Sequence, residues 1–248
     1  KVELAYARLS TDQDNLLNEV GLFWYETQKT FAQKKDINPE KFIAIKRSIF
    51  RLSEYHDLAK KLRWHSEKTY TKILAEKETL LSRSDAMNTD IHILWPLYGD
   101  NKDILHEYFI PKKHVYQFIQ KLKKHVMTYN INILNVTIRE VKKDTTSFLN
   151  YAKEDVYGIV CLFSQKQTSE DEGKMQKFTQ AVIDDAVILN GTFYLPYRLH
   201  YTAKQLLSSY PEIKQWIERK KKYDPNLLLQ SQFFVYINTI LSDKEGIK

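Results

Sequence analysis

The chain has 248 residues and a mass of 29.5 kDa, and its 43% hydrophobic and 28% charged residues exclude wholesale disorder and allow a substantial core. Its one cysteine, Cys161, excludes an intrachain disulfide and a cysteine-based zinc site. The formal charge of +7 favours anionic partners, but 31 acidic residues are interleaved with 38 basic ones, which argues against nucleic-acid binding.

Glycine is scarce, with 6 residues in the whole chain, and this limits how the chain could hold a nucleotide. Neither G-x-G-x-x-G nor G-x-x-x-x-G-K-[ST] occurs, so we expect no standard phosphate loop. The sequence also lacks 18 consecutive apolar residues, and we expect no membrane span. No secretory signal is expected at the first residues.

The first third predicts one strand followed by helices. Residues 2–9 alternate loosely between apolar and polar positions, which is typical of a strand. Ser10, Thr11 and Asp12 are helix-capping residues, and they predict a helix over about 12–30. Residues 40–80 show an amphipathic helical pattern with few breakers.

The middle of the chain alternates between strand and helix patterns. Strands are predicted at 104–110, 131–141, 156–163 and 192–195, with helices from Pro111 and over 170–189. This β-α-β-β-α-β order is the ferredoxin-like split unit, in which two helices cover one face of an antiparallel sheet and leave the other free. We therefore predict an α+β fold, with extra helical segments at 12–30, 40–80 and the C-terminus, and one domain over 1–248.

Three polar side chains share one side of the strand at 131–141. Asn135, Thr137 and Arg139 point away from the side occupied by Leu134, Val136 and Ile138. An arginine there could hold a carboxylate, a phosphate or a developing oxyanion. The strand period agrees equally well with a salt-bridged arginine on a solvated sheet.

Glu107 lies on a mostly apolar strand, on the side of Leu105 and Phe109. A carboxylate is costly to bury there unless it is paired, and Arg139 is the candidate partner. His106 is expected to be an ordinary surface or packed imidazole rather than a catalytic base.

The segment 193–201 is rich in aromatic residues and also carries Arg198 and His200. If it is extended, Tyr194, Arg198 and His200 share one side, an arrangement that suits hydrogen bonding to a polyol or a sugar ring. Tyrosines that pack a sheet edge would give the same pattern. The seven histidines are scattered and no H-E-x-x-H or G-x-S-x-G motif occurs, so neither a metal site nor a serine triad is expected.

Six segments, in order along nearly the whole chain, resemble one protein family. Leu105–Pro111 resembles the family segment LQEYFVP, and Asn135–Arg139 matches NVTIR. Tyr194–Arg198 and Lys220–Pro225 resemble its C-terminal YLPYR and K-x-KYDP segments, and the other two are Tyr6–Ser10 and Ser82–Met87. The chain therefore resembles the FAD-linked oxidases of the vanillyl-alcohol-oxidase type, nearest to sugar and aldonolactone oxidases and decaprenylphosphoryl-ribose oxidase.

The resemblance implies that the chain is the C-terminal substrate, or cap, domain of such an enzyme. It implies a partner, an N-terminal FAD-binding domain missing from this chain, which would hold most of the cofactor. The abrupt start, in which residues 1–8 read as a strand, leads to the same expectation. The implied reaction is hydride transfer from a carbinol of a sugar, polyol or aldonolactone to FAD, and the fragment alone would be inactive.

The resemblance also implies roles for particular residues. Arg139 would steady developing negative charge, with Glu107 beside it as the second catalytic candidate. Substrate contacts are expected from Asn135, Thr137, Tyr197, Arg198 and His200. Some relatives place a lysine at the position of Arg198, and some place a glutamate at the position of Thr137, so the site would not be a simple copy of the alditol-oxidase site.

Two hypotheses follow from the sequence. The first is the cap domain of a flavoprotein oxidoreductase, in the cytoplasm, with membrane association left open and no nucleic-acid partner. The second is a free-standing basic α+β module that binds nucleic acid or another anion.

Overall fold

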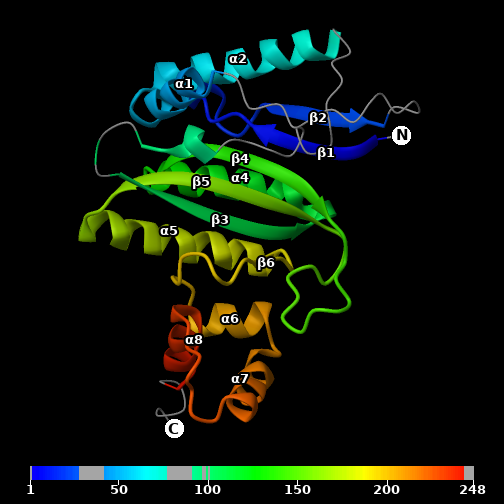
Figure 1. Ribbon diagram of the computed structural model, residues 1–248, viewed down its shortest axis with the longest axis vertical. Helices are drawn as coiled ribbons and strands as arrows, with labels where there is room; N and C mark the ends of the chain where they lie inside the picture. The colour runs from blue at the N-terminus through cyan, green and yellow to red at the C-terminus, as the bar shows by residue number, and fades with distance from the viewer. Residues whose placement is uncertain (1, 28–41, 77–90, 97–98, 100, 243–248) are drawn as a thin grey trace. The chain divides into compact units, whose positions relative to one another are not determined.

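The computed structural model describes residues 2–27, 42–76, 91–96, 99 and 101–242 (Figure 1). The chain divides into two compact units. One comprises Lys1–Asn101 with Leu134–Val136, and the other comprises Lys102–Ile133 with Thr137–Lys248. The strands form one six-stranded sheet in the order β2-β1-β4-β5-β3-β6, and the α+β class is confirmed. A single domain over 1–248 stays a prediction.

The first unit begins with an antiparallel hairpin rather than a strand followed by a helix. Strand β1 (Val2–Leu9) confirms the predicted strand, and it pairs with β2 (Val20–Glu26). Tyr6 lies opposite Phe23, and their ring centroids are 5.0 Å apart in a stacked arrangement.

The predicted helix over 12–30 is therefore wrong for the described residues. Asp12 does cap a helix, but only the 3-10 turn Gln13–Asn15. Beyond the turn, burial alternates with a period of two: Val20, Leu22 and Trp24 are exposed while the residues between them are partly buried. The strand-forming aromatic and branched residues satisfied a helical spacing by coincidence, and pairing with β1 decided their structure.

Two helices follow in the first unit, α1 (Ile43–Tyr55) and α2 (Asp57–Glu76). They confirm the helical pattern predicted for 40–80 over the described residues, while 77–80 lie outside them. His56 separates the helices because its backbone is extended, with φ −134° and ψ 123°. A 3-10 turn, Ile91–Leu94, contacts α1.

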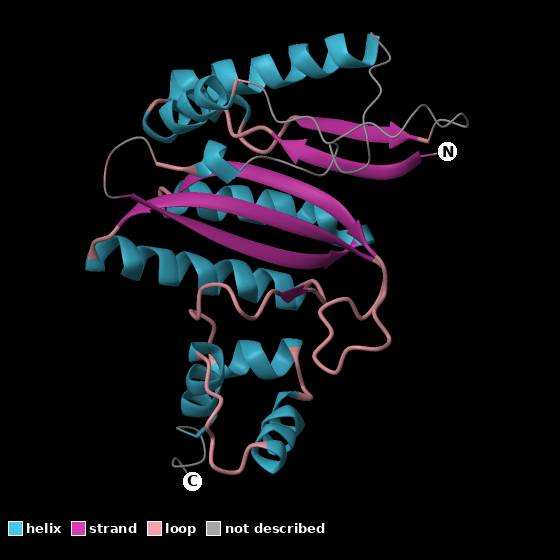
Figure 2. Cartoon of the chain, in the orientation of Figure 1, coloured by secondary structure: helices cyan, strands magenta, loops and turns pink. Residues whose placement is uncertain are grey.

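The second unit contains the predicted β-α-β-β-α-β order. Its elements are β3 (Asn101–Pro111), α4 (Val115–Thr128), β4 (Asn132–Val141), β5 (Val156–Lys166), α5 (Ser169–Ile188) and β6 (Thr192–Phe193) (Figure 2). The spatial order β4-β5-β3-β6 is that of a ferredoxin-like split unit. The last strand is shorter than predicted, since the chain turns at Leu195 and Pro196.

Helices α4 and α5 cover one face of the strands, as predicted. Phe118 of α4 packs against Tyr108 of β3, with ring centroids 5.4 Å apart. Phe178 of α5 packs edge-on against Phe163 of β5, with centroids 5.3 Å apart. These rings are fully buried, and each stabilises the fold by about 1.5–3 kcal/mol through removal of apolar surface from water.

The C-terminal segment is helical, as predicted, with α6 (Ala203–Ser209), α7 (Ile213–Tyr223) and α8 (Gln232–Ser242). The apolar residues near 233–237 belong to α8, which buries Phe234, Ile237 and Leu241. Tyr236 of α8 donates a 2.5 Å hydrogen bond to the Tyr201 carbonyl. Within the described residues, no helix combines the length and the apolar character that crossing a bilayer requires.

Candidate functional site

Glu107 and Arg139 form the predicted pair in the second unit. Arg139 Nη2 lies 2.5 Å and Nε 3.2 Å from the same oxygen, Oε1, of Glu107. The Glu107 side chain is 5% exposed, whereas that of Arg139 is 54% exposed. The buried carboxylate therefore fixes one edge of a guanidinium whose remainder faces solvent.

The period of two in the strands places this pair on the sheet face opposite α4 and α5. On β3, His106 and Tyr108 turn toward the helix-covered core, so Glu107 between them turns the other way. Arg139 reaches Glu107 from β4, and β5 lies between these strands in the sheet. Thr137, two residues before Arg139, is partly buried on the same side of β4.

Gly158 of β5 lies beneath the pair. A methyl group built on Gly158 would lie 3.2 Å from Glu107 Oε1 and 3.5 Å from Arg139 Cγ. The absence of a side chain on the intervening strand is what lets the ion pair span it.

Aromatic rings adjoin the ion pair. Tyr151 stacks on Phe109 of β3, with centroids 4.1 Å apart, and meets Tyr194 edge-on at 6.1 Å. Tyr194 in turn lies 4.7 Å from the ring of Tyr197. Burial raises the pKa of the Tyr197 phenol, and the negative charge of Glu107 raises it further. The Tyr197 hydroxyl therefore stays protonated and able to donate a hydrogen bond near Glu107.

Arg198 and His200 do not join this group. Arg198 Nη2 lies 2.8 Å from Glu172 Oε2, and His200 Nε2 lies 2.9 Å from Glu172 Oε1. Glu172 is in the first turn of α5, and His200 also lies 3.3 Å from Thr179 of that helix. The two residues thus pack against α5.

The expectation that Tyr194, Arg198 and His200 share one side is wrong. It required an extended chain, but the strand ends at Phe193 and the chain turns at Leu195 and Pro196. Burial lowers the pKa of His200, and this effect outweighs the hydrogen bond to Glu172. His200 is therefore a neutral imidazole that contacts Glu172 and Thr179 of α5, and its role here is structural.

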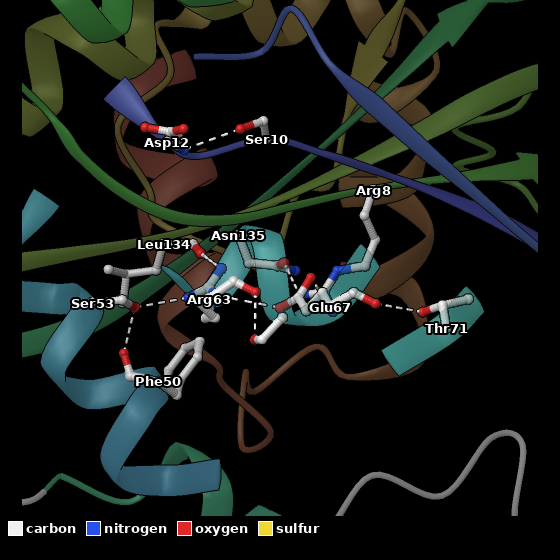
Figure 3. Close-up of polar contacts among 11 residues, drawn as sticks. Arg8, Ser10, Asp12, Phe50, Ser53, Arg63, Glu67, Thr71, Leu134 and Asn135 are labelled. Carbon is white, nitrogen blue, oxygen red and sulfur yellow. Dashed lines mark hydrogen bonds and ion pairs between the residues drawn. The ribbon is translucent and has the colours of Figure 1, made fainter. Parts of the chain in front are cut away.

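Asn135 belongs to the first unit, in a network with β1 and α2 (Figure 3). Its Oδ1 accepts a hydrogen bond from Arg8 Nη2, and Arg8 Nη1 lies 3.2 Å from Glu67 Oε2. Glu67 also pairs with the buried Arg63, at 3.4 Å. The substrate contact predicted for Asn135 would therefore involve a side chain that is already hydrogen-bonded to Arg8.

His106 is a packed imidazole, as predicted, and not a base within reach of solvent. It is 4% exposed and lies among aromatic rings, with the Phe163 centroid 5.2 Å away. Its Nδ1 lies 3.1 Å from the Tyr108 hydroxyl, while Nε2 has no hydrogen-bond partner. Burial lowers the pKa of His106 to about 3, and the nearby positive charge of Arg198 lowers it further.

Sequence reasoning missed three contributors to these arrangements. Glu172 and Tyr151 carry no motif, and their contacts depend on tertiary packing. Gly158 could have been noticed, since an isolated glycine inside a strand pattern often marks a close approach by another group. Among the residues that the structure describes, no cluster of three or more His, Cys, Asp or Glu side chains could hold a metal ion.

Comparison with known proteins adds no assignment. No protein-family model matches the chain, and no curated protein matches it significantly.

Proposed function

We propose that this chain is the substrate-binding domain of an FAD-dependent oxidoreductase that oxidises a carbinol of a sugar, polyol or aldonolactone. Two independent observations support the proposal. Six segments resemble the vanillyl-alcohol-oxidase type, and the strands carrying two of them bring Glu107 and Arg139 together on the sheet face away from α4 and α5.

The observation that carries the proposal is the anchored, half-exposed guanidinium of Arg139. A surface arginine held by an exposed acid would be an ordinary ion pair of little consequence. Here the Glu107 carboxylate is buried and the Arg139 guanidinium is half exposed. Glu107 therefore orients the cation toward a molecule bound at this face of the sheet. Preorganised positive charge of this kind stabilises an oxyanion as it develops.

The residues of this face fit an FAD-dependent reaction. Gly158 leaves bare backbone under the ion pair, and Arg139 presents a cation that would complement an electron-rich ring. When bound, FAD supplies the hydride acceptor. Most of its binding would come from a separate FAD-binding domain, as the family resemblance implies.

This chain's own residues then bind and orient the alcohol. Arg139 holds the substrate oxygen as negative charge develops on it. Tyr197, with its hydroxyl protonated and close to Glu107, donates to a neighbouring hydroxyl of the substrate. Glu107 keeps the guanidinium in place, and the adjacent tyrosine rings give a sugar ring an apolar surface.

The experiment is Arg139→Ala in the protein expressed from its complete reading frame. We expect the variant to bind as much flavin per chain as the unchanged protein does. Its turnover should fall about 100-fold or more, because a preorganised charge contributes this much. Lys142→Ala is the matched control, since Lys142 is an exposed cation directly after the last residue of the same strand, paired with Glu140 and Asp155. Full activity in Arg139→Ala would contradict the assignment.

The free-standing basic module gains no support from the contacts. Several lysines of the second unit are already paired with carboxylates, among them Lys121 with Asp185 and Lys220 with Asp224. Salt-sensitive nucleic-acid binding by the chain would reopen that alternative.

A further inference from the structure

We infer that Gly158 is a positioning residue. Because it has no side chain, the Glu107 carboxylate can lie directly above β5, and in that position the carboxylate orients the Arg139 guanidinium. The inference rests on the proposed function for its catalytic consequence. Its structural content, a coupling between Gly158 and the ion pair, stands on the contacts alone.

Backbone conformation does not explain a glycine at this position. Gly158 lies inside β5 and its φ is outside the left-handed region, so a residue with a side chain could adopt the same backbone. Glycine weakens a strand interior, because it has no side chain to pack and loses more entropy on folding. Glycine is therefore favoured at this position because a side chain would have too little space above the strand.

The space is filled by the ion pair and by one apolar neighbour. A Cβ on Gly158 would lie 3.2 Å from both Glu107 Oε1 and Val141 Cγ2. Val141 packs against the buried cluster of Phe109, Ala152 and Val156, so it has little freedom to withdraw. The carboxylate must then move by a few tenths of an ångström, and Arg139, bonded to that same oxygen through Nε and Nη2, must move with it.

A shift of this size matters for an electrostatic group more than for the fold. Stabilisation of a developing charge depends on donors placed within hydrogen-bonding distance of the reacting atom, and misplacement of about 1 Å can cost 100-fold in rate. Gly158→Ala should therefore impair the reaction while the sheet remains folded.

The structural test is a double-mutant cycle on urea unfolding of the 248-residue chain. Gly158→Ala and Arg139→Ala are made singly and together. We expect Gly158→Ala to lower the folding equilibrium constant about tenfold in the native background and by less than threefold in the Arg139→Ala background, where the carboxylate is free to move. Gly173→Ala is the matched control, because a Cβ on that helical glycine meets nothing within 4 Å.

The catalytic test is the same cycle on turnover of the protein from its complete reading frame. Gly158→Ala should lower kcat about tenfold with flavin content unchanged, and should cause no further loss in the Arg139→Ala background. Equal losses in both backgrounds, or no loss in either, would overturn the inference. If the unfolding cycle shows the coupling but the complete protein holds no flavin, Gly158 keeps its positioning role and the proposed function fails.

Discussion

Arg139 binds Glu107 through two of its nitrogens, and both donate to the same carboxylate oxygen. This geometry differs from the parallel two-oxygen pairing common for arginine and carboxylates. It holds the Nε and Nη2 edge of the guanidinium against the sheet and directs the rest of the group outward. The pair thus combines a buried anchor with an accessible cation.

Removal of one partner should destabilise the chain more than removal of both charges. Arg139→Ala leaves the Glu107 carboxylate, 5% exposed, without its partner, and should cost about 1–3 kcal/mol of unfolding free energy. Adding Glu107→Gln to that variant removes the unpaired charge and should restore part of the loss. Urea unfolding of the single and double variants measures this, and strictly additive losses would contradict it.

His106 should make the chain sensitive to acid. Its folded pKa of about 3 lies below the ordinary value near 6.5, so between these values the unfolded chain binds a proton that the folded chain excludes. The unfolding free energy should fall as pH drops from 6.5 toward 3, by up to about 1.4 kcal/mol per pH unit from this group. In His106→Phe this slope should flatten, whereas His65→Phe, at an exposed histidine on α2, should retain it. An unchanged slope in His106→Phe would refute the assignment.

The N-terminus of α6 should depend on Thr202. Its side chain accepts from the backbone N–H of Gln205, and the Gln205 side chain accepts from the N–H of Thr202. Thr202→Ala should cost about 1 kcal/mol, because one of the free helix N–H groups loses its acceptor. Thr202→Ser keeps the acceptor and should unfold within a few tenths of a kcal/mol of the native chain. Equal losses in thermal unfolding of the two variants would show that the methyl group, not the cap, matters.

Arg63 should be essential for the stability of the first unit. It is 7% exposed, donates from Nη1 to Ser53 Oγ at 2.9 Å, and donates from Nη2 to the Leu134 carbonyl. Arg63→Met leaves those acceptors unpaired and should cost about 3 kcal/mol. Arg63→Lys should recover only part of this, since an ammonium cannot reproduce the planar fork.

The control for Arg63 is Lys61→Ala. Lys61 pairs with Asp14 at 2.5 Å, but both side chains are more than half exposed. Such a pair is screened by solvent, so we expect no measurable change in the unfolding midpoint. A loss as large as that of Arg63→Met would show that burial is not the deciding factor.

Periodicity predicted helix α4 of the second unit well because its apolar residues share one buried side. Phe118, Leu122 and Val126 of α4 recur at helical spacing and are all buried. The Glu107–Arg139 pair was likewise predictable, since a lone carboxylate on an apolar strand requires a nearby cation.

The rest depended on tertiary structure. The segment at 20–26 satisfied a helical spacing, but pairing with β1 and the burial of alternate residues made it a strand. The predicted substrate contact from His200 depends on an extended chain, and the turn at Leu195 and Pro196 interrupts the strand before His200. An isolated glycine in a strand pattern indicates a close approach at Gly158, but it does not identify Glu107 as the partner, because that contact joins strands far apart in sequence.

The most direct test of the central claim is the visible absorption spectrum of the protein expressed from its complete reading frame. The proposal predicts flavin absorption that bleaches when a sugar, polyol or aldonolactone substrate is added without an electron acceptor. A protein that shows no flavin absorption, even after FAD is added, would contradict it.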